Sequence, residues 1–111
     1  MLKKQFRLNV KQYYSSHTPI TNRTASFFRL RFSQNGLGYN RYGFVVSKRV
    51  DKTAVGRNRA KRLLRGCIEN LSEQMKPGYD MLFIIQKQFI HDESITICNE
   101  VKSVLEKELI L

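Results

Sequence analysis

The sequence predicts an α+β fold, a two-layer sandwich in which helices cover a mostly antiparallel sheet. Residues 24–32 and 42–48 alternate apolar and polar side chains with the two-residue period of strands, and residues 79–86 contain the unbroken apolar run of a strand that is covered on both faces. Residues 53–76 and 94–109 carry apolar side chains at helical spacing. With a short first helix, the expected order is helix, two or three strands, helix, strand, helix.

The length of 111 residues predicts one domain, residues 1–111, with a core of modest size. Twenty Lys and Arg residues against nine Asp and Glu residues give a formal net charge of +11 at pH 7. Such an excess favours a polyanionic partner, with nucleic acid, acidic protein and anionic membrane as the candidate classes. The apolar runs are too short for a membrane span, and the first ten residues lack the apolar segment of a signal peptide. We therefore expect a cytoplasmic protein that binds no membrane.

The amino-terminal part predicts an arm and a short helix. Residues 1–8 are basic and without period, so we expect a loosely held arm over the protein surface or a bound RNA. Asn9 is a suitable N-cap for a helix over residues 10–16. Tyr13 and Tyr14 point about 100° apart on that helix, so at most one ring lies fully in the core. The other ring then flanks a groove, where it stacks on a base; core packing is the alternative for either ring.

The strand of residues 24–32 has two unlike faces. Its apolar face comprises Phe28, Leu30 and Phe32. Its other face comprises Phe27, Arg29 and Arg31. Arginines beside an aromatic ring are typical of a surface that receives single-stranded nucleic acid, although an ordinary exposed strand face remains the alternative.

A Gly-rich and Asn-rich segment, residues 33–40, predicts a hairpin connection to an antiparallel strand over residues 42–48. One face of this second strand carries small residues and leaves room for a ligand strand to lie flat. These residues are Gly43, Val45 and Ser47.

The helix of residues 53–76 is expected to begin after its N-cap Thr53 and to end before Pro77 and Gly78. Its apolar stripe docks on the core, and cations occupy much of the remaining surface. No Asp or Glu occurs between Lys52 and Ile68, so the ion pairs four residues apart that would neutralise these cations are missing. An external phosphate chain would compensate the repulsion, whereas an ordinary solvated face is the alternative. The free N–H groups at the helix start add to this attraction for phosphate.

The last strand, the last helix and the two cysteines are expected to have structural roles. The strand of residues 79–86 follows a long helix and is expected to lie parallel to the strand before that helix. Ser94 is expected to cap a last helix that covers the sheet. Cys67 and Cys98 fall on apolar helical stripes without a CxxC motif, which predicts buried free thiols.

The sequence contains no recognisable group of residues for catalysis or metal binding by the chain itself. The two histidines stand alone in expected loops, and the acidic residues gather after Glu69, away from the basic helix. A metal-dependent nuclease needs carboxylates beside the scissile phosphate. We therefore expect no catalytic residue and no metal site, and a nuclease that acts alone is disfavoured.

The segment KRVDKTAVGRNRAKRLLR, preceded by GFVVS, resembles the protein subunit of bacterial ribonuclease P. The signature of that family is a basic helix with Arg-Asn-Arg, then Lys-Arg and a further Arg. The likeness extends from the first helix through the PGYD turn to the last helix. The family commonly has Phe on the first helix where this chain has tyrosines. A ribosomal or other structural RNA-binding domain and a protein-only ribonuclease are the alternatives.

The resemblance implies a ribonucleoprotein whose RNA is the catalyst and removes the 5′ leader of precursor tRNA. It also implies that Mg²⁺ is held by the RNA, that the protein holds no cofactor, and that the parallel crossover is left-handed. The basic helix and its approach would bind the RNA subunit through Lys48, Arg49, Arg57, Asn58, Arg59, Lys61, Arg62 and Arg65. A cleft between the sheet and the first helix would bind the leader through Tyr13, Tyr14, Phe27, Arg29, Arg31, Gly43, Val45 and Ser47.

Overall fold

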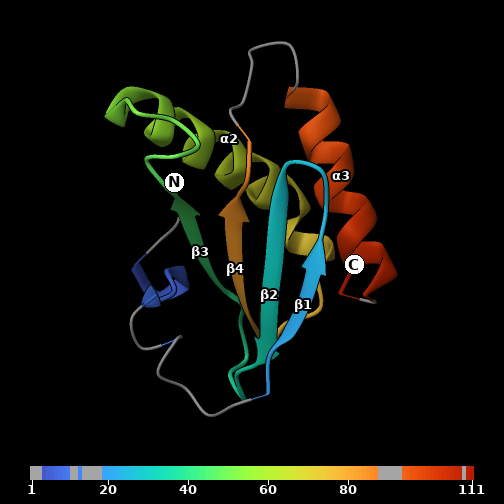
Figure 1. Cartoon of the computed structure of the whole chain (residues 1–111). Coiled ribbons are helices and arrows are strands. Elements are labelled where there is room, and N and C mark those ends of the chain that lie inside the picture. Colours follow the sequence, from blue (N-terminus) through green and yellow to red (C-terminus); the bar gives the residue numbers. More distant parts are fainter. Residues whose placement is uncertain (1–3, 11–12, 14–18, 88–93, 109) are drawn as a thin grey trace.

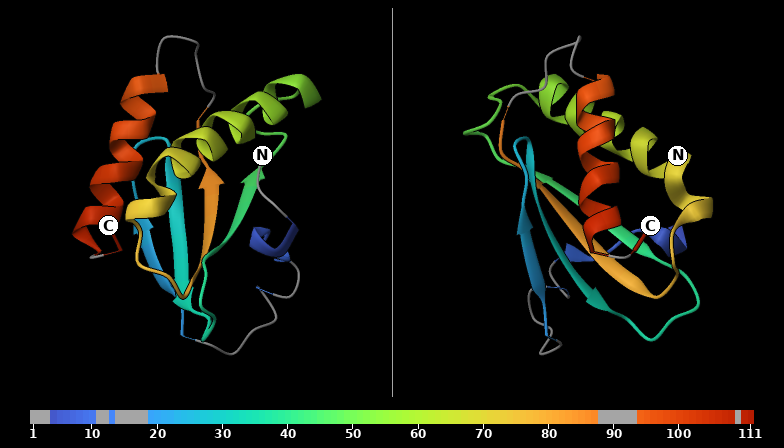
Figure 2. Two further views of the ribbon diagram at one scale, coloured as in Figure 1. Left: turned by 180° about the vertical axis from the view of Figure 1, so that it is seen from behind. Right: turned by 90° about the vertical axis from the view of Figure 1, so that its right-hand side faces the viewer.

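The computed structural model of the chain describes residues 4–10, 13, 19–87, 94–108 and 110–111. Two long helices cover one face of a four-stranded sheet, which makes two layers and confirms the predicted α+β sandwich (Figures 1 and 2). In chain order the elements are η1 (Lys4–Phe6), β1 (Thr21–Thr24), β2 (Phe28–Gln34), β3 (Arg41–Val46), α2 (Ala54–Leu71), η2 (Ser72–Gln74), β4 (Tyr79–Ile85) and α3 (Ser94–Lys107).

The strand order of the sheet is β1-β2-β4-β3. β3 and β4 are parallel neighbours, as predicted. The predicted hairpin between β2 and β3 is wrong, because β4 lies between them and pairs antiparallel with β2. The reason is burial: β4 carries the apolar run Met81–Phe83 with all three side chains fully buried, and such a run is typical of a central strand that is covered on both faces.

β1 is an edge strand that pairs antiparallel with β2. Its sequence, TNRT, has no apolar alternation, and three of its four residues are exposed. The two-residue period therefore did not mark it as a separate strand. A turn over residues 25–27 separates it from β2, so the predicted strand of residues 24–32 begins four residues later, at Phe28.

The β3–α2–β4 crossover is left-handed. In the left panel of Figure 2, α2 lies in front of the sheet, both strands point upward, and β4 lies to the left of β3. Most parallel crossovers have the opposite hand. This agrees with what the family resemblance implied.

The main core lies between the sheet and the two helices. The predicted apolar face of β2 is confirmed, since Phe28, Leu30 and Phe32 are all buried there. α2 contributes Leu64 and Ile68 to the same core. α3 contributes Ile97, Val101 and Leu105.

α2 begins as predicted and ends early. The Thr53 side chain accepts a hydrogen bond from the Gly56 N–H at 3.0 Å, which is an N-cap. The helix stops at Leu71 rather than near residue 76. Ser72 donates its hydroxyl to the Glu69 carbonyl at 2.9 Å, and such a local bond competes with the helical ladder. A 3₁₀ turn then continues to Gln74.

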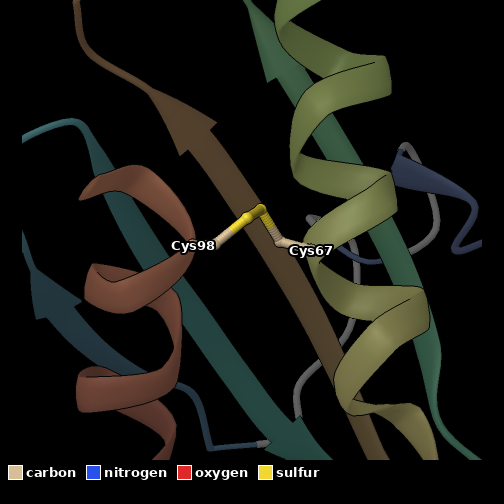
Figure 3. The surroundings of a disulfide bond; sticks show 2 residues. All are labelled: Cys67 and Cys98. Carbon is tan, nitrogen blue, oxygen red and sulfur yellow. A yellow bond between two sulfur atoms is a disulfide. The ribbon is translucent and has the colours of Figure 1, made fainter. Parts of the chain in front are cut away.

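Cys67 of α2 and Cys98 of α3 form a disulfide, with their Cα atoms 5.3 Å apart (Figure 3). The prediction of free thiols is therefore wrong, although Cys67 is buried as expected. The apolar stripes of the two helices face each other where the helices pack. The two cysteines are 31 residues apart in the sequence, so no local motif indicates that they pair.

Reduction of this disulfide should lower the free energy of unfolding by about 2–4 kcal/mol, because the unfolded chain regains the freedom of the opened loop. Urea unfolding with and without dithiothreitol measures the change. A Cys67→Ala/Cys98→Ala variant is the control, and its unfolding midpoint should not respond to the reductant. An unchanged midpoint for the wild-type protein would contradict the disulfide.

Candidate nucleic-acid interface

The apolar side of α2 determines which side chains of the helix face outward. Ala60, Leu64, Cys67 and Ile68 are buried against the sheet and α3. The polar residues of the RNA-binding prediction consequently lie on the outer surface. Lys48, Arg49, Asn58, Arg59 and Arg62 are exposed, and Arg57, Lys61 and Arg65 are half-buried.

Arg57 is fastened to the loop that leads into α2. Its Nη1 donates to the backbone carbonyls of Asp51 and Lys52 at 3.0 and 3.1 Å. Lys48 and Arg49 lie in the turn that begins this loop, where the Ser47 carbonyl accepts the Val50 N–H at 3.1 Å. The start of α2 therefore carries three cations at the end of the helix dipole that attracts anions.

Asp51 is an acidic residue of the loop that leads into α2, and it shapes that loop. Its carboxylate accepts hydrogen bonds from the Thr53 N–H at 2.9 Å and the Thr53 hydroxyl at 2.8 Å. These two bonds, followed by the charges of Arg57 and Arg59, hold the pKa of Asp51 below its usual range. A Cβ atom at Gly56 would lie 1.9 Å from Asp51 Oδ2, so the loop closes on the helix because that residue is glycine.

The middle of α2 presents three cations, Lys61, Arg62 and Arg65, that form no ion pair with the described acids. In the described part of the chain, ion pairs join Arg23 to Glu108, Arg41 to Asp80 and Lys102 to Glu106. Cations of α2 that take no part in these pairs include Arg57, Lys61, Arg62 and Arg65. Asn58, Lys61, Arg62 and Arg65 line one surface hollow. Such an arrangement suits a chain of phosphates.

The opposite face of the sheet brings together part of the predicted cleft. The strand register pairs Arg31 with Leu82, and Leu82 with Gly43. Two residues further along the strands, it pairs Arg29 with Ile84. Directly paired residues point to the same face, so the two arginines and Gly43 share the face away from the helices. Val45 joins them through its pairing with Ile84.

The space above Gly43 is already filled, contrary to the prediction that a ligand strand would lie there. A Cβ atom at Gly43 would lie 3.3 Å from Leu8 Cβ and 3.1 Å from Leu82 Cδ1. The Leu8 N–H donates to the Tyr42 carbonyl at 2.8 Å. Leu8 thus buries its side chain on the apolar part of this face.

The expected loose arm is also wrong for residues 4–8, because they follow the β3 edge. Arg7 forms an isolated parallel bridge with Tyr42, and the Phe6 ring meets the Tyr39 ring edge-on with centroids 5.5 Å apart. η1 lies beside β3 in Figure 1. The part of the predicted arm over residues 1–3 lies outside the described residues.

Tyr13 is buried at 4% exposure, in a second apolar cluster with Leu8 and Leu82. Its N–H donates to the Asn9 carbonyl at 2.9 Å, which is the helical bond expected from an N-cap at Asn9. Tyr13 therefore has the core role that one of the two tyrosines was expected to have. Tyr14 and most of the predicted helix over residues 10–16 lie outside the described residues.

Two residues of the predicted cleft lie elsewhere. Phe27 precedes β2 and packs on the helix-covered core, where its N–H donates to Glu100 Oε1 at 2.9 Å and the Lys87 Nζ lies 5.5 Å from its ring centre. The strand alternation does not extend through the turn of residues 25–27, so it misplaced Phe27. Ser47 lies beyond the end of β3, in the turn toward α2.

Sequence reasoning missed a polar pair on the open face. Arg41 donates from Nε and Nη2 to the two carboxylate oxygens of Asp80, both at 2.7 Å. The hydrogen bond to Asp80 raises the pKa of Arg41, so this guanidinium remains charged. Asn35 Nδ2 also donates to Asp80 Oδ1 at 3.0 Å. The PGYD turn that contains Asp80 could be recognised in the sequence, but Arg41, which binds Asp80, lies 39 residues earlier in the chain.

Groups of three or more His, Cys, Asp or Glu side chains that could hold a metal ion do not occur among the described residues. Within the same part of the chain, neither the length nor the composition of any helix suits a membrane crossing.

Comparison with known proteins gives one consistent result. A family model described as Ribonuclease P matches residues 2–108. The ribonuclease P protein component of Thermoanaerobacter sp. (strain X514) is 31% identical over 97 residues, which cover 87% of this chain and 80% of that protein. The corresponding protein of Caldanaerobacter subterraneus subsp. tengcongensis is 33% identical over the same shares.

Solved structures show the same fold. The RNase P protein of Thermotoga maritima matches with a TM-score of 0.76 and 21% identity, covering 91% of this chain and 96% of that chain. An RNase P protein of Staphylococcus aureus matches with a TM-score of 0.75 and 19% identity, covering 95% and 96% of the two chains.

Replacing Thr53 with Ala should raise the Asp51 pKa toward its ordinary value of 3.8 and cost about 1 kcal/mol of stability, because both the hydroxyl donor and the N-cap are lost. The depressed pKa means that this carboxylate stabilises the fold above its unfolded pKa, and that the contribution disappears as pH falls through the folded pKa. Carboxyl NMR titration measures the shift. Ser103→Ala, on the exposed side of α3, is the control, and an unmoved Asp51 pKa in Thr53→Ala would refute the assignment.

Proposed function

The chain belongs to the ribonuclease P family, and we propose that it acts in bacterial tRNA processing as the protein component that binds the RNA subunit through α2. The observation that carries this proposal is a set of outward cations on an apolar-anchored helix, Lys61, Arg62 and Arg65, which form no ion pair with the described carboxylates. Bound RNA phosphates would replace the missing acids.

The proposal divides the work between protein and RNA. The RNA subunit hydrolyses the precursor and coordinates Mg²⁺, as the family resemblance implies. The protein contributes fixed positive charge at the start and along the outer side of α2, which lowers the repulsion between RNA phosphates. Lower repulsion lets the RNA fold and hold its metal ions at a smaller Mg²⁺ concentration. The place of this work is the cytoplasm.

The open face of the sheet is proposed to hold the 5′ leader of precursor tRNA. Arg29 and Arg31 lie there, and the register adds Thr24 and Asn22 of β1 beside them. Because Leu8 covers Gly43, the leader would lie over the β1–β2 side of this face rather than over β3. Arg29 is exposed and is the member of the predicted cleft best placed to meet a phosphate.

Cleavage of a precursor tRNA by protein alone, RNA alone and the two together tests the division of work. We expect no cleavage by the protein, and faster cleavage by the pair than by RNA alone at low Mg²⁺, because the protein's charge substitutes for counterions. Activity of the RNA-free sample would support a protein-only ribonuclease. A protein that never changes the RNA's rate would support a structural RNA-binding domain instead.

An Arg57→Ala/Arg62→Ala variant should bind the RNA subunit roughly tenfold to a hundredfold more weakly, since two phosphate contacts are lost. Filter binding of the RNA transcript measures the affinity. Circular dichroism should show the same helix content because neither side chain is part of the core, although Arg57→Ala also removes two hydrogen bonds to the loop before α2. Lys102→Ala/Lys107→Ala removes the same charge from the exposed surface of α3 and is the matched control. Equal losses in both variants would mean that only net charge matters.

An Arg29→Ala variant should lose affinity for leader-bearing precursor tRNA by about fivefold to tenfold while mature tRNA is bound as before, because only the leader reaches the open face. Competition binding to the assembled ribonucleoprotein compares the two RNAs. The same loss for both RNAs would remove the open face from leader binding and leave the α2 interface intact.

A further inference from the structure

A second cationic hollow lies at the β3 edge of the sheet. It is bordered by the amino-terminal segment, by β3 and by α2. The lining residues that carry the argument are Arg7, Phe44, Lys61 and Arg65. Lys61 and Arg65 also line the first hollow, together with Asn58 and Arg62, so the two hollows adjoin.

Positive charge converges in this hollow. Arg7, Lys61 and Arg65 all line it, and its lining contains no carboxylate among the described residues. Arg65 is held at the wall, with its guanidinium carbon 5.6 Å from the centre of the Phe44 ring. That ring stacks in turn on Phe83, with centroids 5.6 Å apart and an angle of 15° between the planes. Three converging cations repel one another unless an anion lies between them.

The backbone around Arg7 is held in place. The Arg7 N–H donates to the Lys4 carbonyl at 3.1 Å, Arg7 bridges Tyr42, and the next residue, Leu8, donates its N–H to the Tyr42 carbonyl at 2.8 Å. Leu8 also buries its side chain against Leu82. Arg7 thus enters the hollow from a backbone that is fixed on the sheet edge, so binding a ligand costs little further backbone entropy.

We propose that this hollow binds one backbone phosphate of the RNA subunit, with Arg7 closing a three-cation site whose other members are Lys61 and Arg65. The inference rests on the proposed function and extends it, because the RNA strand bound along α2 would continue around the β3 edge. Lys61 and Arg65 are four residues apart on one side of α2 and line the same hollow, so both side chains can reach a single phosphate there. The shared lining of the two hollows provides the continuous path.

The test is the binding of the full chain to the ribonuclease P RNA transcript across a series of salt concentrations. Arg7→Ala should weaken binding about tenfold and reduce the slope of log affinity against log salt by about one, the value for one lost phosphate contact. Arg7→Lys should keep most of the slope. Lys102→Ala, which removes one charge from the outer side of α3, should leave the slope unchanged.

A double-mutant cycle tests whether the cations share one phosphate. Arg7→Ala combined with Arg65→Ala should lose less affinity than the product of the two single losses, whereas Arg7→Ala combined with Arg57→Ala should give the full product. An Arg7→Ala slope equal to that of Lys102→Ala, or a full product for Arg7 with Arg65, would overturn the site. If Arg57→Ala and Arg65→Ala also have no effect, the α2 interface itself fails, and the two failures are thereby distinguished.

Discussion

The structure depends on the way α2 is attached. Its apolar stripe is buried against the sheet and α3. This packing holds a row of like charges close together despite their mutual repulsion. An isolated helix with this sequence would be destabilised by the repulsion between like charges four residues apart. Here the core supplies the stabilisation that the charged side lacks. The helix can therefore present Lys61, Arg62 and Arg65 to an external polyanion.

The central strand β4 explains why the two faces of the sheet differ. It separates β2 from β3 and buries side chains on both faces, so each face needs a cover. The helices cover one face, and Leu8 and Tyr13 cover part of the other. On the β1–β2 side of the open face, Arg29 is exposed and Arg31 is half-buried. The amino-terminal segment therefore narrows the proposed leader-binding surface and borders the α2 surface at the β3 edge.

Local patterns in the sequence predicted the class of fold, the basic helix, its N-cap Thr53, and the parallel pairing of β3 with β4. The first three features depend on residues close together in the chain. The parallel pairing was predicted from the length of the helix that connects the two strands. The errors concern contacts between distant segments: β4 inserted between β2 and β3, Cys67 joined to Cys98, and Leu8 placed over Gly43. Phe27 was misplaced because period two cannot show where a turn interrupts a strand.

The salt dependence of RNA binding by the wild-type protein tests the central claim most directly, because that claim is one of unneutralised charge. If about six phosphates are neutralised, the logarithm of affinity should fall with the logarithm of salt concentration at a slope of about −4 to −5. An affinity that stays constant across the salt series would show that the cations of α2 are not what holds the RNA.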